Sequence, residues 1–168
     1  GDPAFSCSVL FSPDHPAYAE IEAATEEVIK AKWGAKAASV KKEMVLKDRL
    51  ALHDGDAKEQ YSGFPGNFFV SCRNKVRPTV IDRDRTPLNA QDGKPYAGCY
   101  VNISIELWAQ DNAYGKRVNA SLRGIQFAAD GEAFSGGGSA DADEFEPIAE
   151  GADIVVTSAH KDRKSTRL

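Results

Sequence analysis

Three stretches of the chain alternate apolar and polar residues with a period of two, which is the pattern of β-strands that bury one face. They are Asn67–Lys75, Tyr100–Ala109 and Arg117–Arg123. In the second stretch the apolar residues form an unbroken row, so Tyr100 and Trp108 fall on the polar side. A core does not need large aromatic residues on that side, so the sheet is expected to present them at its surface.

Basic residues gather on the same polar sides, with Arg73 and Lys75 in the first stretch and Arg117 and Arg123 in the third. Cations hold phosphates while aromatic faces stack bases, so the pattern suggests a surface for single-stranded nucleic acid. Ordinary sheets with one face in solvent also alternate apolar and polar residues and expose arginines. The recurrence of both residue kinds on one side of three strands favours nucleic acid. The candidate contacts taken from alternation alone are Phe69, Trp108, Arg117 and Asn119.

The rest of the first 134 residues predicts one helix and further strands. From Pro16 to Trp33 apolar residues recur at steps of three or four, and acidic residues precede lysines, as in a helix with a favourable dipole. Phe5–Phe11 and Thr79–Ile81 are expected as strands, and residues 36–66 as a loop with one short element. The prediction is a mainly β fold: an OB-fold-like five-stranded Greek-key barrel with one capping α-helix and a flexible C-terminal segment.

The net charge of −4 is distributed unevenly along the chain. Residues 1–129 carry 17 basic and 16 acidic side chains, a net of +1, whereas residues 130–153 carry eight acidic and no basic ones. Ser135–Ser139 has the composition of a flexible linker. We predict an OB-fold domain with the binding face over residues 1–134, and a Gly/Ser linker with an acidic, flexible tail over 135–168. The hypothesis that follows is a tail that competes with nucleic acid for the basic sheet.

Several other classes of protein are not favoured by the sequence. The cysteines Cys7, Cys72 and Cys99 are far apart and form no C-x-x-C pair, so buried thiols are expected rather than disulfides or a zinc site. There is no apolar run of eighteen residues and no signal-peptide pattern, so neither a membrane span nor export is expected. No metal or other cofactor is predicted.

Two alternative functions stay open at this point. A metal-dependent nuclease would need carboxylates that converge on one site, for which Asp54, Asp82 and Asp84 are the candidates. A protein-interaction module would use the same β face, with Tyr100 and Trp108 as interface anchors. A binding protein without catalysis is the preferred interpretation, because nothing in the sequence indicates that the carboxylates converge.

Five short segments resemble, in their order along the chain, a family of phage single-stranded DNA-binding proteins, over roughly residues 5–146. They are Lys32–Gly34, Tyr61–Phe69, Asn74–Pro78, Tyr96–Tyr100 and Leu122–Gln126. The resemblance implies a single OB barrel with an acidic C-terminal tail. It also implies a protein that coats single-stranded DNA during phage replication and recombination, in the cytoplasm of the infected bacterial host. Phage or host replication and recombination proteins are implied as further partners of the tail.

The resemblance also supplies candidate DNA contacts, and the chain departs from the family's pattern at two places. The matching positions are Arg73, Lys75, Arg77, Tyr100 and Arg123. Members of the family generally have a further strand before the segment that matches Phe5–Phe11, and Ile154–Thr157 is the internal segment expected to substitute for it. The ending Lys161–Leu168 is basic where an acidic tail is expected to continue.

Overall fold

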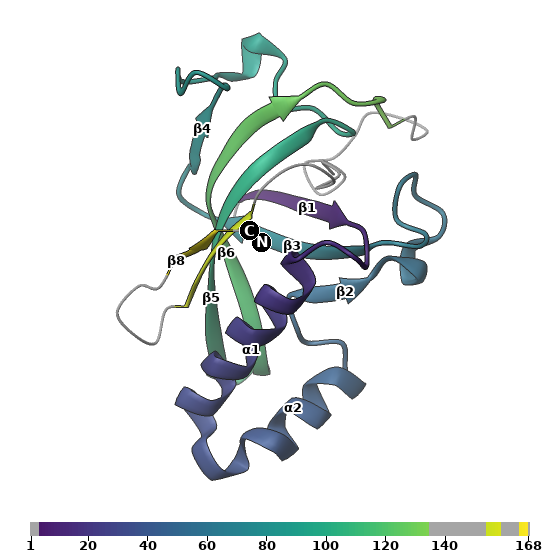
Figure 1. Cartoon of the computed structure of the whole chain (residues 1–168). Coiled ribbons are helices and arrows are strands. Elements are labelled where there is room, and N and C mark those ends of the chain that lie inside the picture. Colours follow the sequence, from purple (N-terminus) through teal and green to yellow (C-terminus); the bar gives the residue numbers. More distant parts are fainter. Residues whose placement is uncertain (1–3, 135–153, 159–164, 168) are drawn as a thin grey trace.

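A computed structural model describes residues 4–134, 154–158 and 165–167 (Figure 1). Within these residues the chain is mainly β, with one long helix and one shorter helix. The strands are β1 (Phe5–Phe11), β2 (Leu52–Asp54), β3 (Phe68–Asn74), β4 (Thr79–Ile81), β5 (Tyr100–Asn112), β6 (Gly115–Ala129), β7 (Ile154–Ser158) and β8 (Ser165–Arg167). The helices are α1 (Ala17–Trp33) and α2 (Ala37–Leu46), with 3-10 turns η1 (Gly34–Lys36), η2 (Gly55–Lys58) and η3 (Ala90–Asp92).

The strands form one mixed sheet in the order β1-β3-β6-β5-β7-β8, with β2 added to β3 and β4 added to β6. The β1–β3 and β5–β6 pairs are antiparallel. β3 meets β6 in parallel at a single pair of residues, Arg73 and Ser121. The two antiparallel halves therefore touch at one point and diverge from it, which opens the sheet between β3 and β6.

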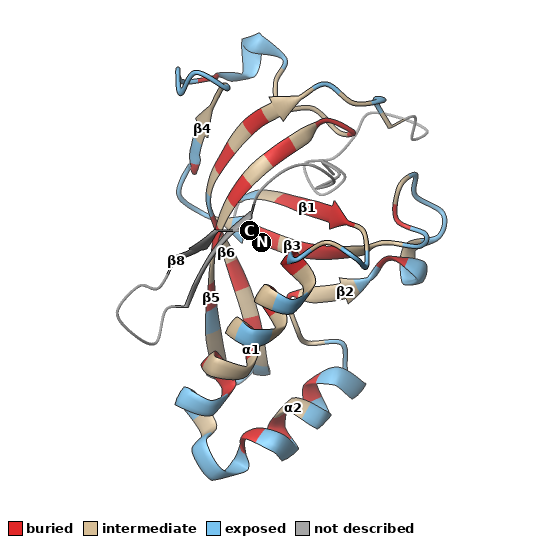
Figure 2. Ribbon diagram, viewed as in Figure 1, coloured by how far each residue is buried: buried red, intermediate tan, exposed pale blue. Residues whose placement is uncertain are grey.

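The core lies between the sheet and α1, where Figure 2 shows the buried residues of β5, β6 and α1 in red. Ile21, Val28 and Ile29 of α1 are buried in the same cluster as the apolar rows of β5 and β6. β6 keeps its inward row by a bulge: Gly124 pairs with Ser104 and Leu122 with Ile105, so Arg123 is the extra residue.

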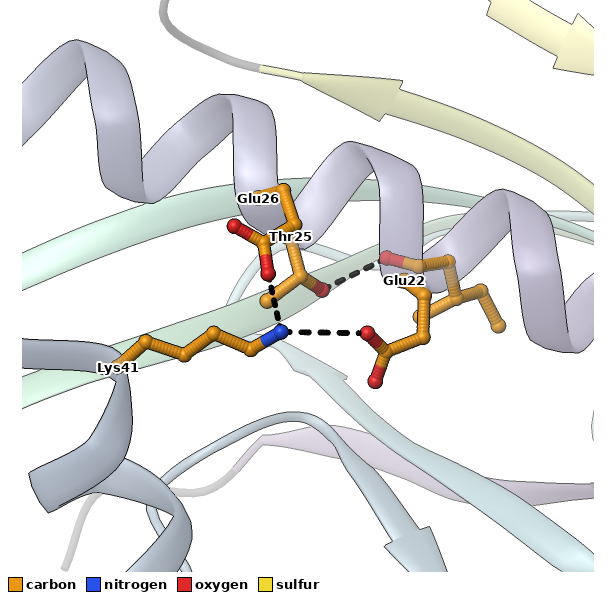
Figure 3. Close-up of polar contacts among 5 residues, drawn as sticks. Glu22, Thr25, Glu26 and Lys41 are labelled. Atoms are coloured by element: carbon orange, nitrogen blue, oxygen red, sulfur yellow. Dashed lines mark hydrogen bonds and ion pairs between the residues drawn. The ribbon is translucent and has the colours of Figure 1, made fainter. Parts of the chain in front are cut away.

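α1 begins and ends where the sequence predicts. Gly34 follows its last residue with φ 53°, a left-handed value that favours glycine, and its N–H caps the carbonyl of Lys30. α2 packs back on α1 through Lys41, whose ammonium group contacts both Glu26 and Glu22, the latter at 3.4 Å (Figure 3). The hydrogen bond with Glu26 raises the pKa of Lys41. Thr25, also drawn there, is buried and donates to the Ile21 carbonyl at 2.7 Å.

The predicted fold class is confirmed, and the structure corrects some of its details. Residues 36–66, expected to be mostly loop, contain α2 and β2. Ile154–Thr157, the expected substitute strand, lies within β7 and pairs in parallel with β5. β7 and β8 both belong to the sheet, so these parts of the predicted tail are strands. The Gly/Ser linker and the acidic stretch from 139 to 153 lie outside the described residues, and the proposed domain boundary stays a prediction.

The structure also describes the three cysteines and both helices. Cys7, Cys72 and Cys99 are free and buried, as expected. Cys7 and Cys72 face each other across β1 and β3 with their sulfur atoms 3.5 Å apart. Within the described part of the chain, no helix has the length and apolarity needed to cross a membrane.

Candidate nucleic-acid interface

The polar faces of β1, β3, β5 and β6 line a common groove of about 720 Å³, here called the sheet groove. It lies where β3 and β6 diverge from their single contact. The segment from Arg49 to Ala51 spans this gap: the Arg49 carbonyl accepts the N–H of Val118 at 3.1 Å, and the Ala51 carbonyl accepts the N–H of Ser71 at 3.0 Å. The groove therefore has a backbone floor that ties the two halves of the sheet together.

The charge of the sheet groove contrasts with that of the whole chain. Its lining contains Lys58, Arg73 and Arg117, and among the described residues that form it there is no aspartate or glutamate. Most of its other polar side chains are uncharged serines, asparagines and a glutamine. A chain with a net charge of −4 thus folds so that three cations share one acid-free depression. Such a site attracts a polyanion.

Trp108 forms part of the groove wall on β5 and is 38% exposed. Its indole N–H donates to the hydroxyl of Ser121 on the neighbouring strand β6 at 3.0 Å. This hydrogen bond restrains the ring at a partly open position. A ring held in this way offers an aromatic face for stacking.

Arg117 and Asn119 follow along the polar side of β6. Asn119 donates from its amide to Gln110 at 2.9 Å, so its orientation is fixed within the sheet. The Nε atom of Arg117 is buried and has no hydrogen-bond partner among the described residues. An unsatisfied buried donor costs free energy, so the position is suited to an acceptor from a ligand.

Phe69 is the predicted contact that the structure corrects. Alternation places it on the polar side of β3, but its side chain is only 3% exposed because it packs against Leu10 and Phe64. The rings of Phe64 and Phe69 meet edge to face at 4.9 Å, and the imidazole of His53 stacks on Phe69 at the same centroid distance. Phe69 thus supports the groove from beneath and leaves no free ring face for a base.

Lys58, His53 and Tyr114 line the groove although sequence reasoning did not select them. Lys58 ends η2, and its ammonium group lies 5.2 Å from the centre of the Phe69 ring and 5.5 Å from that of Phe64. The signal available for Lys58 was its position just before the aromatic segment Tyr61–Phe69. Tyr114, at the tip of the β5–β6 hairpin, is 84% exposed.

The other predicted contacts lie outside the lining of the sheet groove. Lys75 and Arg77 are exposed beyond the end of β3, and Arg77 donates to the Leu88 carbonyl at 3.0 Å. Arg123, at the bulge of β6, forms an ion pair with Glu106 at 3.4 Å. Tyr100 begins β5, eight residues before Trp108, which corresponds to about 26 Å along a strand. The structure therefore unites Arg73, Trp108, Arg117 and Asn119, and it separates them from Tyr100.

The carboxylates considered for a nuclease have local roles in turns. Asp54 accepts the N–H of Asp56 at 2.9 Å and caps η2. Asp84 accepts both the N–H and the hydroxyl of Thr86, and the hydroxyl contact lowers the pKa of Asp84. Across the residues that the structure describes, no three His, Cys, Asp or Glu side chains are grouped to hold a metal ion.

Comparison with known proteins identifies the family to which the chain belongs. The family model described as the ssDNA-binding protein of Enterobacter phage Enc34 matches residues 1–155. The chain belongs to this family of phage ssDNA-binding proteins. The putative protein p50 of Acyrthosiphon pisum secondary endosymbiont phage 1 is 50% identical over 131 residues, which cover 77% of this chain and 70% of that protein.

Solved structures of the Enc34 protein are also similar to the structure of this chain. Its complex with ssDNA matches with a TM-score of 0.64 and 28% identity, covering 80% of this chain and 76% of that one. A C-terminal truncation of the same protein matches with a TM-score of 0.61 and 28% identity, covering 80% and 75%. The family and the mainly β, OB-fold-like architecture predicted from the sequence are thereby confirmed.

Proposed function

We propose that the chain binds single-stranded DNA in the sheet groove, with a base stacked on Trp108 and phosphates held by Lys58, Arg73 and Arg117. The observation that carries this proposal is the cationic lining of the groove, which among the described residues contains no acid, in a chain that is acidic overall. Membership of a family of phage ssDNA-binding proteins supports it independently. The Enc34 relative solved in complex with ssDNA supports the same ligand.

Binding of this kind combines charge neutralisation with stacking. Each phosphate contact releases condensed counterions, so affinity falls with salt. Each stacked base contributes about 1–3 kcal/mol and tolerates any sequence, since every base has a π face. The proposed protein therefore has little sequence preference, and it binds duplex less well because duplex bases are already stacked on one another.

The biological role we propose is the protection of single strands during phage replication and recombination, without catalysis, in the cytoplasm of the infected host. Contacts outside the groove extend the footprint. Those proposed from the family resemblance are Lys75, Arg77, Tyr100 and Arg123. The acidic segment from Asp141 to Glu150 competes with DNA for the groove. Once DNA has displaced this segment, replication and recombination proteins can bind it.

The test is a fluorescence-anisotropy titration of a labelled poly-dT strand of about 30 nucleotides at low and high salt, with matched duplex as competitor. Tight binding that weakens with salt would support the proposal, provided that duplex competes for the protein only weakly. The same measurement addresses a protein-interaction module, because a sheet that binds only protein would leave the strand free at both salt concentrations. Loss of input DNA in magnesium would instead indicate a nuclease.

A further inference from the structure

A second groove begins where the sheet groove ends. It lies between α2, Arg49 and the tip of the β5–β6 hairpin, and its volume is about 430 Å³; we call it the helix–hairpin groove. Asn112 and Tyr114 line both grooves. The two depressions therefore meet at the hairpin tip, at an aromatic side chain that is 84% exposed.

Arg49 holds this junction in place. Its guanidinium donates from Nη1 to the Tyr114 carbonyl at 3.0 Å, while its own carbonyl accepts the N–H of Val118 at 3.1 Å. Gly115, with φ 109°, lies so close that a Cβ there would be 2.0 Å from Nη1 of Arg49. The tip that carries Tyr114 is thus anchored to the segment that floors the sheet groove.

The helix–hairpin groove is also cationic. Lys47, Arg49 and Lys116 line it, against Glu43 and Asp111. Both acids are already engaged: Glu43 accepts from Lys47 at 2.7 Å, and Asp111 accepts the indole N–H of Trp33 at 3.4 Å. The net charge of the lining is therefore +1, from three cations and two acids.

The Lys47–Glu43 pair does not prevent Lys47 from binding a phosphate. Both side chains are more than half exposed, and exposed ion pairs are weak and screened by salt. The hydrogen bond from Lys47 lowers the pKa of Glu43. The charges of Lys116 and Arg49, which line the same groove, lower it further.

Resting on the proposed function, we infer that a DNA strand leaving the sheet groove passes over Tyr114 into the helix–hairpin groove, where Lys47 and Lys116 contact its phosphates. The ligand there is the sugar–phosphate backbone of the same single strand. Tyr114 stacks a base between the two grooves. The binding site is then longer than the sheet groove, and the added part contributes mainly electrostatic affinity.

The experiment compares dT oligomers from about 4 to about 16 nucleotides, the range of sites on single OB folds. The double variant Lys47→Ala/Lys116→Ala is set against Lys36→Ala/Lys42→Ala, which removes the same charge from exposed residues of η1 and α2 that do not line the groove. The salt slope is the slope of log K for DNA binding against log salt concentration. For long oligomers this slope is expected to be about 1.4 shallower in the groove variant than in the control, from two lost phosphate contacts of about 0.7 each. For the shortest oligomers the two variants are expected to bind equally.

The outcomes separate this inference from the proposed function. If the wild type binds long oligomers but the groove variant and its control are equal at every length, the strand does not enter the helix–hairpin groove. If the groove variant is weaker than its control by the same factor at every length, the lysines do not contact a separate, distal part of the strand and the inference also fails. If the wild type binds no oligomer, the proposed function itself is wrong. Tyr114→Ala should weaken only the oligomers that reach the hairpin tip.

Discussion

The indole N–H of Trp108 on β5 donates to the hydroxyl of Ser121 on β6 at 3.0 Å, and Ser121 is also the residue where β6 meets Arg73 of β3. One serine thus joins the aromatic wall of the sheet groove to the point at which the two halves of the sheet touch. This arrangement places a restrained ring beside cations on three different elements.

Replacing Trp108 with alanine should weaken binding to poly-dT by about 1–3 kcal/mol, or roughly 5- to 160-fold, because one stacking surface is lost. Trp108→Phe should restore most of the affinity. Anisotropy titration measures both. Tyr61→Ala is the matched control, since Tyr61 is 37% exposed and lies outside the groove lining. An equal loss in the control would show that stacking is not localised at Trp108.

Replacing Arg117 with alanine should lower the affinity and make the salt slope shallower by about 0.7, the value for one phosphate contact on a single strand. The free energy of unfolding should not fall, because the substitution removes a buried donor that has no partner among the described residues. Urea unfolding measures the second effect. Arg83→Ala, in an exposed turn away from the groove, is the control and should leave the slope unchanged. A slope unaltered in the Arg117 variant would rule out its phosphate contact.

The protein should lose stability at alkaline pH through Cys99. Burial raises the pKa of this thiol from its ordinary value of 9.0 to about 11. The folded state therefore keeps a proton that the unfolded state loses between these values, so the free energy of unfolding falls as pH rises through this window, by up to about 2.7 kcal/mol. Urea unfolding from pH 8 to pH 11 measures the fall. Cys99→Ala should be less stable at pH 8 but show a flatter profile, and an equally steep profile would contradict the assignment.

Neutralising the six acids between residues 139 and 153, by Asp→Asn and Glu→Gln, should strengthen poly-dT binding at low salt if the segment competes for the sheet groove. Substitution is preferable to deletion because the segment leads into β7, which pairs with β5. The matched control adds the peptide 139–153 in trans, in its acidic and neutralised forms, and only the acidic form should displace DNA. Unchanged affinity of the variant would count against autoinhibition.

Strand alternation brings candidate contacts together in the sheet groove where the periodicity is regular, and it misleads where other segments cover the same face. Trp108, Arg117 and Asn119 line the groove because they lie on the polar side of long strands. Phe69 obeys the same alternation, yet it is covered by Leu10, its partner on the neighbouring strand β1, and by Phe64 from the loop before β3. A period of two assigns a side chain to a face but does not show what lies on that face.

The second helix and the groove cations Lys58 and Arg49 were not predicted, for related reasons. α2 is short, follows a 3-10 turn and has no side-chain cap, so few local signals mark its start. Arg49 lies in the loop after α2 and Lys58 at the end of the short 3-10 turn η2, and each reaches its groove only through tertiary contacts. β7, in contrast, could be proposed because Ile154–Thr157 is a compact apolar run with high β-propensity.

Photo-crosslinking would show where on the protein the DNA lies. A poly-dT strand carrying 5-iododeoxyuridine, photo-crosslinked to the wild-type chain and mapped by mass spectrometry, should attach to the rings that line the sheet groove, Trp108 first and Tyr114 next. Crosslinks should decrease with salt as binding does. Crosslinks confined to α1 or to the loop after β4, with none on β5 or β6, would contradict binding of DNA in the sheet groove.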